Sequence, residues 1–521
     1  MIELDATSGD IDSHRADHAD LLLQLVPAFD ALPVIEARAR RCVPLRDAHG
    51  RLVVAAAPSD RMLVIRWLDG RTDEPYTLIE QPPELIARAL EHHATSAKAM
   101  DTFGVSGDGA ATAGIAGEVL SLDRIQVETS TTIRLTNSIV YDAYRIGASD
   151  IHFETTAHSL RVKYRLDGVL AVVSEIPGIQ HAEEAISRLK VMSDLDIAER
   201  RIPQDGRLRV LIEGRDIDIR VSIMPSIHGE DAVLRILDKT ALMDHLRNLT
   251  LESLGVAPED VRQLRRMARE PYGMLLVTGP TGSGKTTTLY AMLSEINDGR
   301  DKIITIEDPV EYQLPDVLQI PVNEKKGLTF ARGLRSILRH DPDKIMVGEI
   351  RDSETAQIAV QSALTGHLVF TTVHANNALD VMDRFHHMGV PLHSFVTCLN
   401  AVLAQRLIRI NCPRCKEPYA PEDELLEASG LAEVDVNSIE FFRGRGCEWC
   451  RGTGYKGRRA VPELLRLDSD IREAIVDGMP QRQLRKLARQ RGMRPLREAA
   501  ISLVQQGEST LEEINRVTFV E

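Results

Sequence analysis

The sequence predicts an α/β protein built from several domains. From Pro271 onward, short apolar runs alternate with turns and helical segments, a rhythm typical of a mostly parallel sheet with helices on both faces. A glycine-rich loop, Gly279-Pro-Thr-Gly-Ser-Gly-Lys-Thr286, stands between the first of these strands and a helix. With 521 residues the chain is long enough for three or more domains, since one takes roughly 100–200 residues.

Composition indicates a cytoplasmic globular protein. Aromatic residues make up only 4% of the chain, which favours aliphatic α/β packing. Met1–Ala19 is acidic where a signal peptide needs a basic start. Apolar stretches such as Leu21–Leu25 fall far short of the ~20 residues that span a bilayer, so any membrane role is expected to be peripheral. A formal charge of −14 disfavours bulk nucleic-acid binding.

The N-terminal half is expected to hold two small α/β domains. We expect the first at 1–94 and, after a flexible linker at 95–120, the second at 121–245. The linker is predicted because Gly104–Gly114 is rich in Gly, Ala, Ser and Thr and cannot bury a core. Alternating segments such as Leu160–Leu166 predict half-buried strands in the second domain.

The glycine-rich loop fits the P-loop pattern and has the strand and helix flanks that the pattern requires. Backbone N–H groups of such a loop bind phosphate oxygens, the lysine reaches the β- and γ-phosphates, and the Thr286 hydroxyl ligates Mg²⁺. We therefore expect ATP and Mg²⁺ as ligands of a P-loop domain at 246–410. The predicted loop residues are Gly279, Pro280, Thr281, Gly282, Ser283, Gly284, Lys285, Thr286 and Thr287.

Acidic residues end two further predicted strands, as ATP hydrolysis requires. Glu349 follows the apolar run Ile345–Val347, and Glu307, Asp308 and Glu311 follow Ile303–Ile306. Carboxylates at strand ends also cap helices, so a structural role is the alternative for each. The sequence leaves open whether Glu307 or Glu349 positions the attacking water.

Several blocks, in order, resemble the secretion ATPases of bacterial type II secretion and type IV pili. The resemblance runs from about Ile125 to Leu465. The blocks include Gly147-Ala-Ser-Asp-Ile-His-Phe-Glu154, Arg201-Ile-Pro-Gln-Asp-Gly-Arg207, Ile306-Glu-Asp-Pro-Val-Glu311, Leu338-Arg-His-Asp-Pro-Asp343, Val347-Gly-Glu-Ile-Arg-Asp352 and Thr365-Gly-His-Leu-Val-Phe-Thr-Thr-Val-His-Ala-Asn376.

The resemblance implies a RecA-like ATPase domain behind a PAS-like α/β domain, in subunits that form a homo-hexameric ring. It places Glu307 and Asp308 in an aspartate box and Glu349 in a Walker B motif. His367 and His374 fall in a histidine box, where they would sense phosphate; the alternative is a structural histidine. The residues at the family's arginine positions are Arg220, Arg235, Arg335 and Arg339.

An arginine beside the γ-phosphate neutralises charge that develops in the transition state. We expect catalytic roles for Lys285, Glu307, Glu349, Arg220 and Arg235, and nucleotide contacts from Asp308, Arg335, Arg339, His367 and His374. For Arg335 the alternative is an ion pair along its own helix.

Two C-x-x-C pairs, separated by 31 residues, predict a structural zinc site in a subdomain at 411–463. Four thiolates suit tetrahedral Zn²⁺ and leave no open position for catalysis. A redox dithiol is the alternative, although it needs only one pair. The ligands would be Cys412, Cys415, Cys447 and Cys450, and a helical region follows at 464–521.

The sequence thus predicts a hexameric ATPase motor that powers pseudopilus assembly and protein export by a type II secretion system. Its expected partners are an inner-membrane platform protein and the cytoplasmic part of a membrane-anchored component, the latter docking on 1–94. A type IV pilus assembly ATPase is the alternative within the family. A DNA-handling translocase, or a nucleotide switch that acts as a scaffold, is the alternative from another class.

Overall fold

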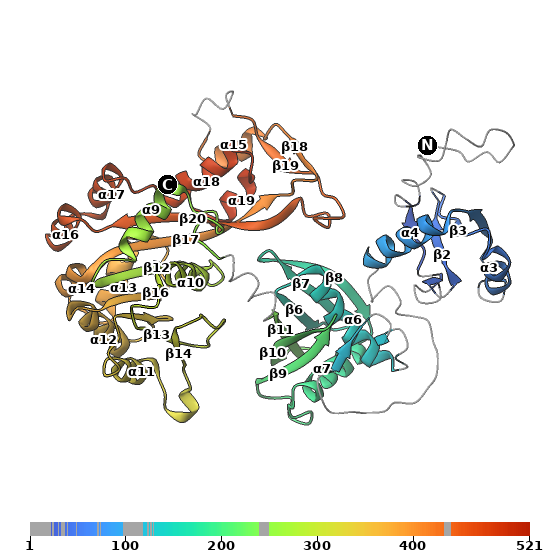
Figure 1. The fold of residues 1–521 in the computed structure, drawn as a ribbon, viewed down its shortest axis with the longest axis horizontal. Coiled ribbons are helices and arrows are strands. Elements are labelled where there is room, and N and C mark those ends of the chain that lie inside the picture. Colours follow the sequence, from blue (N-terminus) through green and yellow to red (C-terminus); the bar gives the residue numbers. More distant parts are fainter. Residues whose placement is uncertain are drawn as a thin grey trace. The chain divides into compact units, whose positions relative to one another are not determined.

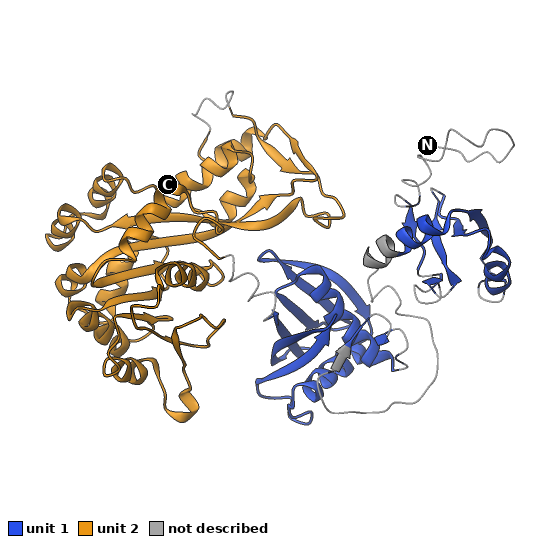
Figure 2. Ribbon diagram, viewed as in Figure 1, with its two compact units in different colours: residues 1–238 blue, residues 239–521 orange. Residues whose placement is uncertain are grey.

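A computed structural model describes residues 22–96, 118–238, 249–431 and 439–520, apart from brief gaps before residue 74 and between 122 and 129. The chain forms two compact units, residues 1–238 and 239–521 (Figure 2). The linker expected at 95–120 lies almost wholly outside the described residues, as does the start of the 1–94 module. Among the described helices, none is long and apolar enough to cross a membrane.

The first unit contains a four-stranded sheet near its N-terminus (Figure 1). Its strands, in spatial order, are β1 (Val26–Pro27), β2 (Cys42–Arg46), β3 (Leu52–Ala56) and β4 (Tyr76–Glu80). Strand β3 is buried along its whole length, and it pairs with β4 in parallel through the connecting helix α3 (Arg61–Leu68). Helix α4 (Pro83–Ser96) adds Ile86, Ala89 and Leu90 to the core of this sheet.

The first unit also contains a separate seven-stranded sheet. Its strands, in spatial order, are β5 (Glu118–Leu120), β9 (Gln204–Ile212), β10 (Arg215–Ser226), β11 (Gly229–Asp238), β6 (Asp150–Thr155), β7 (Ser159–Leu166) and β8 (Val169–Pro177). Alternate residues of β10, from Ile217 to Ile223, are buried. They share one core with helices α6 (Thr131–Ile146) and α7 (Ile179–Met192), so the other face of the sheet carries the polar side chains.

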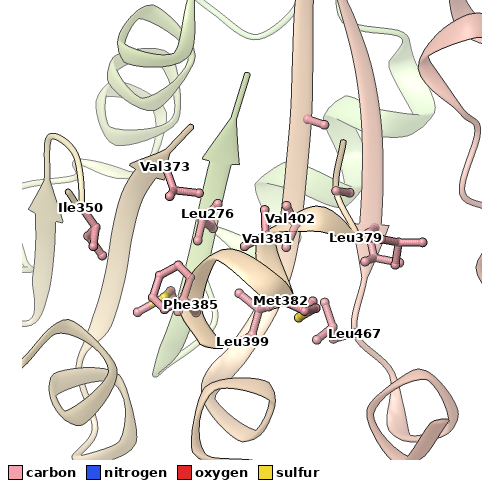
Figure 3. Packing of buried hydrophobic residues seen from close by; sticks show 14 of the residues in the cluster. Leu276, Ile350, Val373, Leu379, Val381, Met382, Phe385, Leu399, Val402 and Leu467 are labelled. Atoms are coloured by element: carbon pink, nitrogen blue, oxygen red, sulfur yellow. The ribbon is translucent and has the colours of Figure 1, made fainter. Parts of the chain in front are cut away.

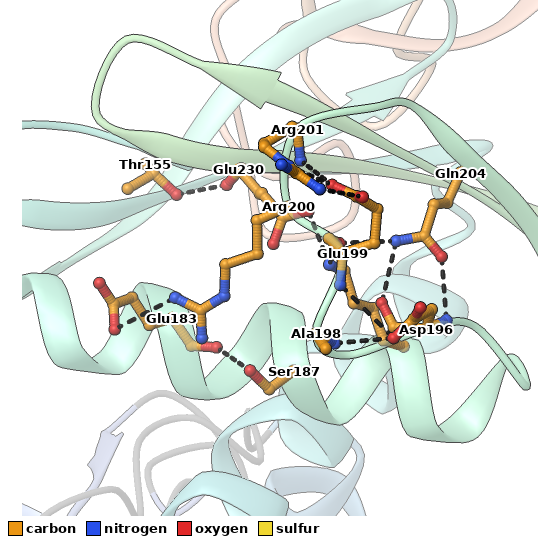
Figure 4. Close-up of polar contacts among 11 residues, drawn as sticks. Thr155, Glu183, Ser187, Asp196, Ala198, Glu199, Arg200, Arg201, Gln204 and Glu230 are labelled. Atoms are coloured by element: carbon orange, nitrogen blue, oxygen red, sulfur yellow. Dashed lines mark hydrogen bonds and ion pairs between the residues drawn. The ribbon is translucent and has the colours of Figure 1, made fainter.

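Polar contacts hold the segment between α7 and β9, and Figure 4 shows those of Asp196, Glu199 and Gln204. Lys190 is 1% exposed, and its Nζ contacts Glu230 Oε1 at 2.7 Å and donates to the Glu199 carbonyl at 2.7 Å. The Gln204 side chain donates to the carbonyls of Asp196 and Glu199, both at 2.9 Å. These contacts order the turn that leads into β9 and Arg207.

The second unit contains a mixed seven-stranded sheet. Its strands, in spatial order, are β14 (Leu318–Pro321), β13 (Ile303–Glu307), β15 (Lys344–Val347), β16 (Leu368–Val373), β12 (Gly273–Thr278), β17 (Leu399–Asn411) and β20 (Tyr455–Arg466). All pairings from β14 to β17 are parallel, and β20 pairs with β17 in antiparallel fashion. The largely parallel sheet expected from the sequence is confirmed.

Two hydrophobic cores cover the two faces of this sheet, as the alternation of β12 shows. Met274 and Leu276 face one core, whereas Leu275 and Val277 face the other. The core around Leu275 includes helices α9 (Pro258–Met267) and α10 (Lys285–Ile296). The core around Leu276 (Figure 3) includes helices α11 (Phe330–Ile337), α12 (Ser353–Leu364), α13 (Asp380–His387) and α14 (Leu392–Cys398).

The C-terminal helices pack into the Leu276 core rather than forming a core of their own. They are α16 (Ser469–Val476), α17 (Gln481–Gln490), α18 (Leu496–Gln505) and α19 (Leu511–Val517). Between β17 and β20 lie β18 (Lys416–Pro418), α15 (Asp423–Ala428) and β19 (Phe442–Gly444). Strand β20 continues through the boundary expected after residue 463; the division into domains stays a prediction.

Candidate functional site

The P-loop joins β12 to α10 and adopts a conformation that glycine allows. Gly279, Gly282 and Gly284 have φ values of 149°, 78° and 82°. Such positive φ angles strain other residues, so these glycines let the chain wrap around an anion. Gly284 is the N-cap of α10 and carries no side chain, which leaves the first N–H groups of the helix open to a phosphate.

Lys285 is folded back onto the loop. Its Nζ donates to the carbonyl oxygens of Gly279 at 2.9 Å and of Pro280 at 3.0 Å. Burial lowers the pKa of Lys285, Glu349 opposes this shift, and the Arg406 guanidinium adds to it. A partly buried ammonium that donates to neutral carbonyls is well placed to exchange them for phosphate oxygens.

The strand register brings the predicted acids to the edge of the sheet that holds the P-loop. Thr278 pairs with Val373, and Ile306 pairs with Val347. Glu307 is the last residue of β13, and Val347 also pairs with Thr371, two residues before the end of β16. Glu349, two residues beyond Val347, therefore stands at about the level where β12 and β16 end. Because parallel strands end at the same edge, residues far apart in sequence meet there.

Glu349 lies in a charged cluster at this edge. Its carboxylate is 3.8 Å from His374 Nε2 and forms an ion pair with Arg351. Arg351 Nη1 is also 3.7 Å from Asp308 Oδ2, so one guanidinium joins the two predicted acidic motifs. Arg351 was not among the residues selected from the sequence, although it stands two residues after Glu349 in a block that resembles the secretion ATPases.

Glu307 occupies a different environment from Glu349. It is 2% exposed, and its carboxylate accepts hydrogen bonds from the Tyr290 hydroxyl, from Thr305 Oγ1 at 2.5 Å and from Gln319 Nε2 at 3.0 Å. Both carboxylate oxygens therefore bind groups of the domain itself. The structure separates the two glutamates that the sequence left equivalent.

The two histidines lie at opposite ends of β16. His374 follows the strand beside the P-loop, whereas His367 precedes it and Nδ1 lies 3.1 Å from the Ser362 carbonyl. At ~3.3 Å per residue, the seven steps between them span about 23 Å. Burial and the charge of Lys285 lower the pKa of His374, although Glu349 opposes them. The structure therefore brings His374, and not His367, to the P-loop edge of its own chain.

Arg220 and Arg235 belong to the first unit and are directly opposed across β10 and β11. Arg235 Nε contacts Asp150 Oδ1 at 2.9 Å. On its other side, Arg220 is paired with Arg207 of β9, so three arginines form one row on the polar face of the sheet. Arg207 was not selected from the sequence, although it ends the block that begins at Arg201.

Arg335 and Arg339 lie at the end of α11 and just beyond it. Arg335 forms an ion pair with Glu354 of the neighbouring helix α12, and Arg339 Nη1 donates to the Arg335 carbonyl at 2.9 Å. An ion pair was the alternative expected for Arg335, but the partner lies on another helix rather than on its own. Both side chains are already engaged within the second unit.

The four cysteines of the two C-x-x-C pairs converge. Their sulfur atoms all lie within 4.8 Å of one another, and the Cys412–Cys447, Cys415–Cys450 and Cys447–Cys450 pairs are 3.8, 3.7 and 3.7 Å apart. A tetrahedron with Zn–S bonds of ~2.3 Å has S–S edges of about 3.8 Å, so the spacing fits zinc. A disulfide, with sulfurs ~2.05 Å apart, does not match it.

Hydrogen bonds around the cluster favour thiolates. The N–H groups of Gly446 and Cys447 donate to Cys415 Sγ at 3.3 Å and to Cys450 Sγ at 3.1 Å. Burial opposes ionisation of both thiols: it raises the pKa of Cys415 to about 12 despite the Gly446 N–H, whereas backbone hydrogen bonds outweigh it at Cys450 and lower that pKa to about 6. A cluster of this kind is prepared for a cation, since metals bind the thiolate form.

A family model described as "Type II/IV secretion system protein" matches residues 126–516. The matched segment includes the P-loop, both acidic strand ends and the four clustered cysteines. The chain belongs to this family. The resemblance to secretion ATPases expected from the motif blocks is therefore confirmed.

The names of similar proteins agree with this family assignment. The chain is 42% identical over 493 residues to type II secretion system protein E of Dickeya dadantii (strain 3937), covering 95% of this chain and 91% of that protein. It is 45% identical over 387 residues to type II secretion system ATPase E of Vibrio cholerae serotype O1, covering 74% of this chain and 75% of that protein. The prediction of a family of ATPases is confirmed.

A pilus protein and a solved structure extend the comparison. The chain is 44% identical over 391 residues to the type IV pilus assembly ATPase PilB of Thermus thermophilus, covering 75% of this chain but only 43% of PilB. The ATPase DotB of Yersinia pseudotuberculosis superposes with a TM-score of 0.53 at 20% identity, covering 74% of this chain and 94% of DotB. The predicted fold class is confirmed.

Proposed function

We propose that this chain is the ATP-hydrolysing motor of a type II secretion system and that it drives assembly of a pseudopilus. The observation that carries the proposal is the edge of the second-unit sheet, where the P-loop, Glu349, Arg351, Asp308 and His374 meet. Family membership supports the reaction, and near full-length similarity to a type II protein E supports the system.

In the proposed site, residues 279–287 bind the phosphates. Lys285 exchanges the Gly279 and Pro280 carbonyls for β- and γ-phosphate oxygens, and the Thr286 hydroxyl is the expected protein ligand of Mg²⁺. The metal ion would neutralise phosphate charge. Arg351, bound to both Glu349 and Asp308, keeps these carboxylates at the edge until nucleotide arrives.

We assign orientation of the attacking water to Glu349 rather than to Glu307. Glu307 is buried, and both of its oxygens accept hydrogen bonds from neighbouring side chains. Glu349 is held by two exposed side chains, Arg351 and His374, which can rearrange without unfolding the core. Glu307 then acts indirectly, by anchoring β13 to α10 through Tyr290 beside the P-loop.

We propose that the arginines complete the site between subunits of a hexameric ring. Arg220 and Arg235 lie together on the polar face of the first unit, where they can face the γ-phosphate of an adjoining subunit. Arg335 and Arg339 would contact nucleotide after leaving their present partners. His374 is the candidate phosphate sensor, and His367 joins a site only if another subunit supplies it.

We propose Zn²⁺ as the ion held by Cys412, Cys415, Cys447 and Cys450. The sulfur spacing and the N–H donors support this assignment. Bound zinc would lock β17 and β20 together beyond the sheet, because the two cysteine pairs follow and precede these strands. Such a role is structural, since four protein ligands fill a tetrahedral ion.

We further propose a cytoplasmic location, peripheral to the inner membrane. The partners would be a membrane platform protein and the cytoplasmic part of a membrane-anchored component, which docks on residues 1–94. Expression of the chain lacking residues 1–94 tests this step. ATPase activity should remain while the protein leaves the membrane fraction; continued membrane association would contradict docking through this module.

ATPase assays of the purified chain test the motor. We expect Lys285→Ala to abolish ATP binding and Glu349→Gln to lower kcat by about 100-fold or more, as loss of a water-positioning group does in related chemistry. Glu424→Gln, an exposed change on α15, is the matched control and should match wild type. A wild type no faster than Glu349→Gln would overturn the proposal.

Two further results would favour the alternatives. Strong stimulation of ATP hydrolysis by DNA would support a translocase, and nucleotide binding without turnover would support a switch. A pilus assembly role is separated from secretion by deleting the gene: loss of exported proteins from the medium supports type II secretion, whereas loss of surface pili with normal export supports pilus assembly.

A further inference from the structure

We infer that Gln405, on strand β17, is a positioning residue that holds the P-loop in its phosphate-binding conformation. The inference rests on the proposed function, because it assigns a role to Gln405 at the same ATP site. Gln405 lies more than a hundred residues after the loop and outside every motif block recognised in the sequence.

Both ends of the Gln405 side chain are committed to the loop and its helix. Gln405 is 1% exposed; Nε2 donates to the Ser283 carbonyl at 2.7 Å, and Oε1 accepts from Thr288 Oγ1 at 2.7 Å. The orientation of the amide is determined by Ser283, whose carbonyl can only accept. A buried amide with both ends satisfied is a rigid brace.

Two glycines of the P-loop rest on the same residue. A Cβ atom on Gly279 would lie 2.5 Å from the Gln405 carbonyl oxygen, and one on Gly284 would lie 2.9 Å from Gln405 Nε2. No side chain fits at such distances. The loop therefore packs directly against Gln405. This close packing is a second reason, besides their backbone angles, why positions 279 and 284 are glycine.

The hydrogen bond to Ser283 determines where the loop presents its donors. In a trans peptide the C=O and the next N–H point in opposite directions. Since the Ser283 carbonyl points at Gln405, the Gly284 N–H points away from β17. The second bond holds Thr288, whose N–H donates to Gly284 at 3.0 Å in the first turn of α10. Gln405 thus fixes the loop and the helix start as one unit.

The neighbouring Arg406 fixes the brace itself. Arg406 is 8% exposed, and its guanidinium donates to the Gln405 carbonyl at 3.1 Å and to the Asn376 carbonyl at 2.7 Å. Asn376 lies two residues after His374. The segment that carries the candidate phosphate sensor is therefore tied to the strand that carries the brace.

Binding of a fluorescent ATP analogue and steady-state kinetics test the inference. Gln405→Met fills the space but makes neither hydrogen bond, so Ser283 loses its partner and the loop loses preorganisation. An unpaired buried carbonyl costs enough free energy to weaken ATP binding by about tenfold. We expect the Kd and KM for ATP to rise by about tenfold or more while kcat changes by less than about threefold, since bound phosphates restore the loop.

Two variants separate the contacts, and a third is the control. Gln405→Glu still accepts from Thr288 but cannot donate to Ser283, and should raise KM as Gln405→Met does. Thr288→Val removes only the other bond and should raise KM less. Gln490→Met, on the exposed end of α17, should match wild type. Should Gln405→Met fail to fold, the difference between Gln405→Glu and Thr288→Val decides.

An unchanged KM in both Gln405 variants, or equal losses in kcat and binding, would overturn the inference. Failure of the proposed function has another signature: wild type lacks turnover, or Lys285→Ala binds ATP as wild type does. The two failures are therefore distinguishable.

Discussion

The hydroxyl of Tyr290 donates a hydrogen bond to the carboxylate of Glu307, and this bond links the P-loop helix α10 to the end of strand β13. Tyr290 is fully buried and packs edge-on against Tyr312 with ring centroids 5.0 Å apart. The contact makes an acidic motif part of the core that supports the nucleotide loop.

Tyr290→Phe should destabilise the second unit. The change leaves the buried Glu307 with one donor fewer, a loss of about 1–3 kcal/mol in the free energy of unfolding. Chemical denaturation of the full chain measures it. Tyr272→Phe, at a residue that is 61% exposed, is the matched control and should change the free energy by less than about 0.5 kcal/mol. Equal stability of the two variants would contradict an important role for this bond.

Glu307→Gln and Glu349→Gln should fail in different ways. At 307 the amide brings an N–H₂ group among three donors, so unfolding free energy should fall by about 1–3 kcal/mol. Glu349→Gln should leave the free energy of unfolding unchanged but lower kcat strongly. Parallel denaturation and kinetic measurements compare them. A stable Glu307→Gln chain with no turnover would instead make Glu307 the water-positioning residue.

Mixed rings test whether Arg235 acts on a neighbour's nucleotide. The Lys285→Ala variant lacks the P-loop lysine but keeps Arg235. The Arg235→Ala variant lacks the arginine but keeps an intact P-loop. If the arginine acts between subunits, mixing the two variants should produce more ATPase activity than either alone, because some interfaces contain both intact parts. Activity that equals the average of the separate variants at every ratio would place the arginine in its own subunit's site.

Purified chain should contain about one zinc ion, measured by elemental analysis. Cys412→Ser should lose the metal and make the segment between β17 and β20 sensitive to protease. Cys398→Ser is the control, since Cys398 is buried in α14 and donates to the Phe395 carbonyl at 3.2 Å, apart from the cluster. Full zinc content in Cys412→Ser would refute the predicted site.

Glu513 should make the stability of the second unit depend on acid. It is 1% exposed and accepts from Arg409 and Arg516; burial raises its pKa, but these hydrogen bonds outweigh burial and lower it below the ordinary 4.5. A lowered folded pKa means that the stabilisation is complete above about 4.5 and is lost as pH falls through the folded pKa.

Glu513→Gln isolates this contribution. At pH 7 it should cost ~3 kcal/mol, because it leaves the Arg409 charge uncompensated. The difference in unfolding free energy from wild type should shrink as pH falls from 6 toward 3.5. Glu512→Gln, at an exposed neighbour, provides the control. A difference that stays constant with pH would show that ionised Glu513 is not the stabilising form.

Patterns within short segments determined much of this protein from sequence alone. The P-loop, the acids after Ile306 and Val347, and the paired cysteines each rest on neighbours in the chain, and so does the alternation that predicted a parallel sheet. These features are local because backbone angles, strand burial and the turns within each C-x-x-C pair depend on a few adjacent residues.

Only the tertiary structure distinguished Glu307 from Glu349, placed His367 and His374 at opposite strand ends, and revealed Arg351 and Gln405. Each of these results depends on which strands are neighbours, on their register and on what surrounds a side chain. Gln405 and Ser283 are 122 positions apart, and no sequence pattern in either segment predicts the hydrogen bond between them. Hydrogen bonds and burial are properties of the packed sheet, so they emerge only when the chain is folded.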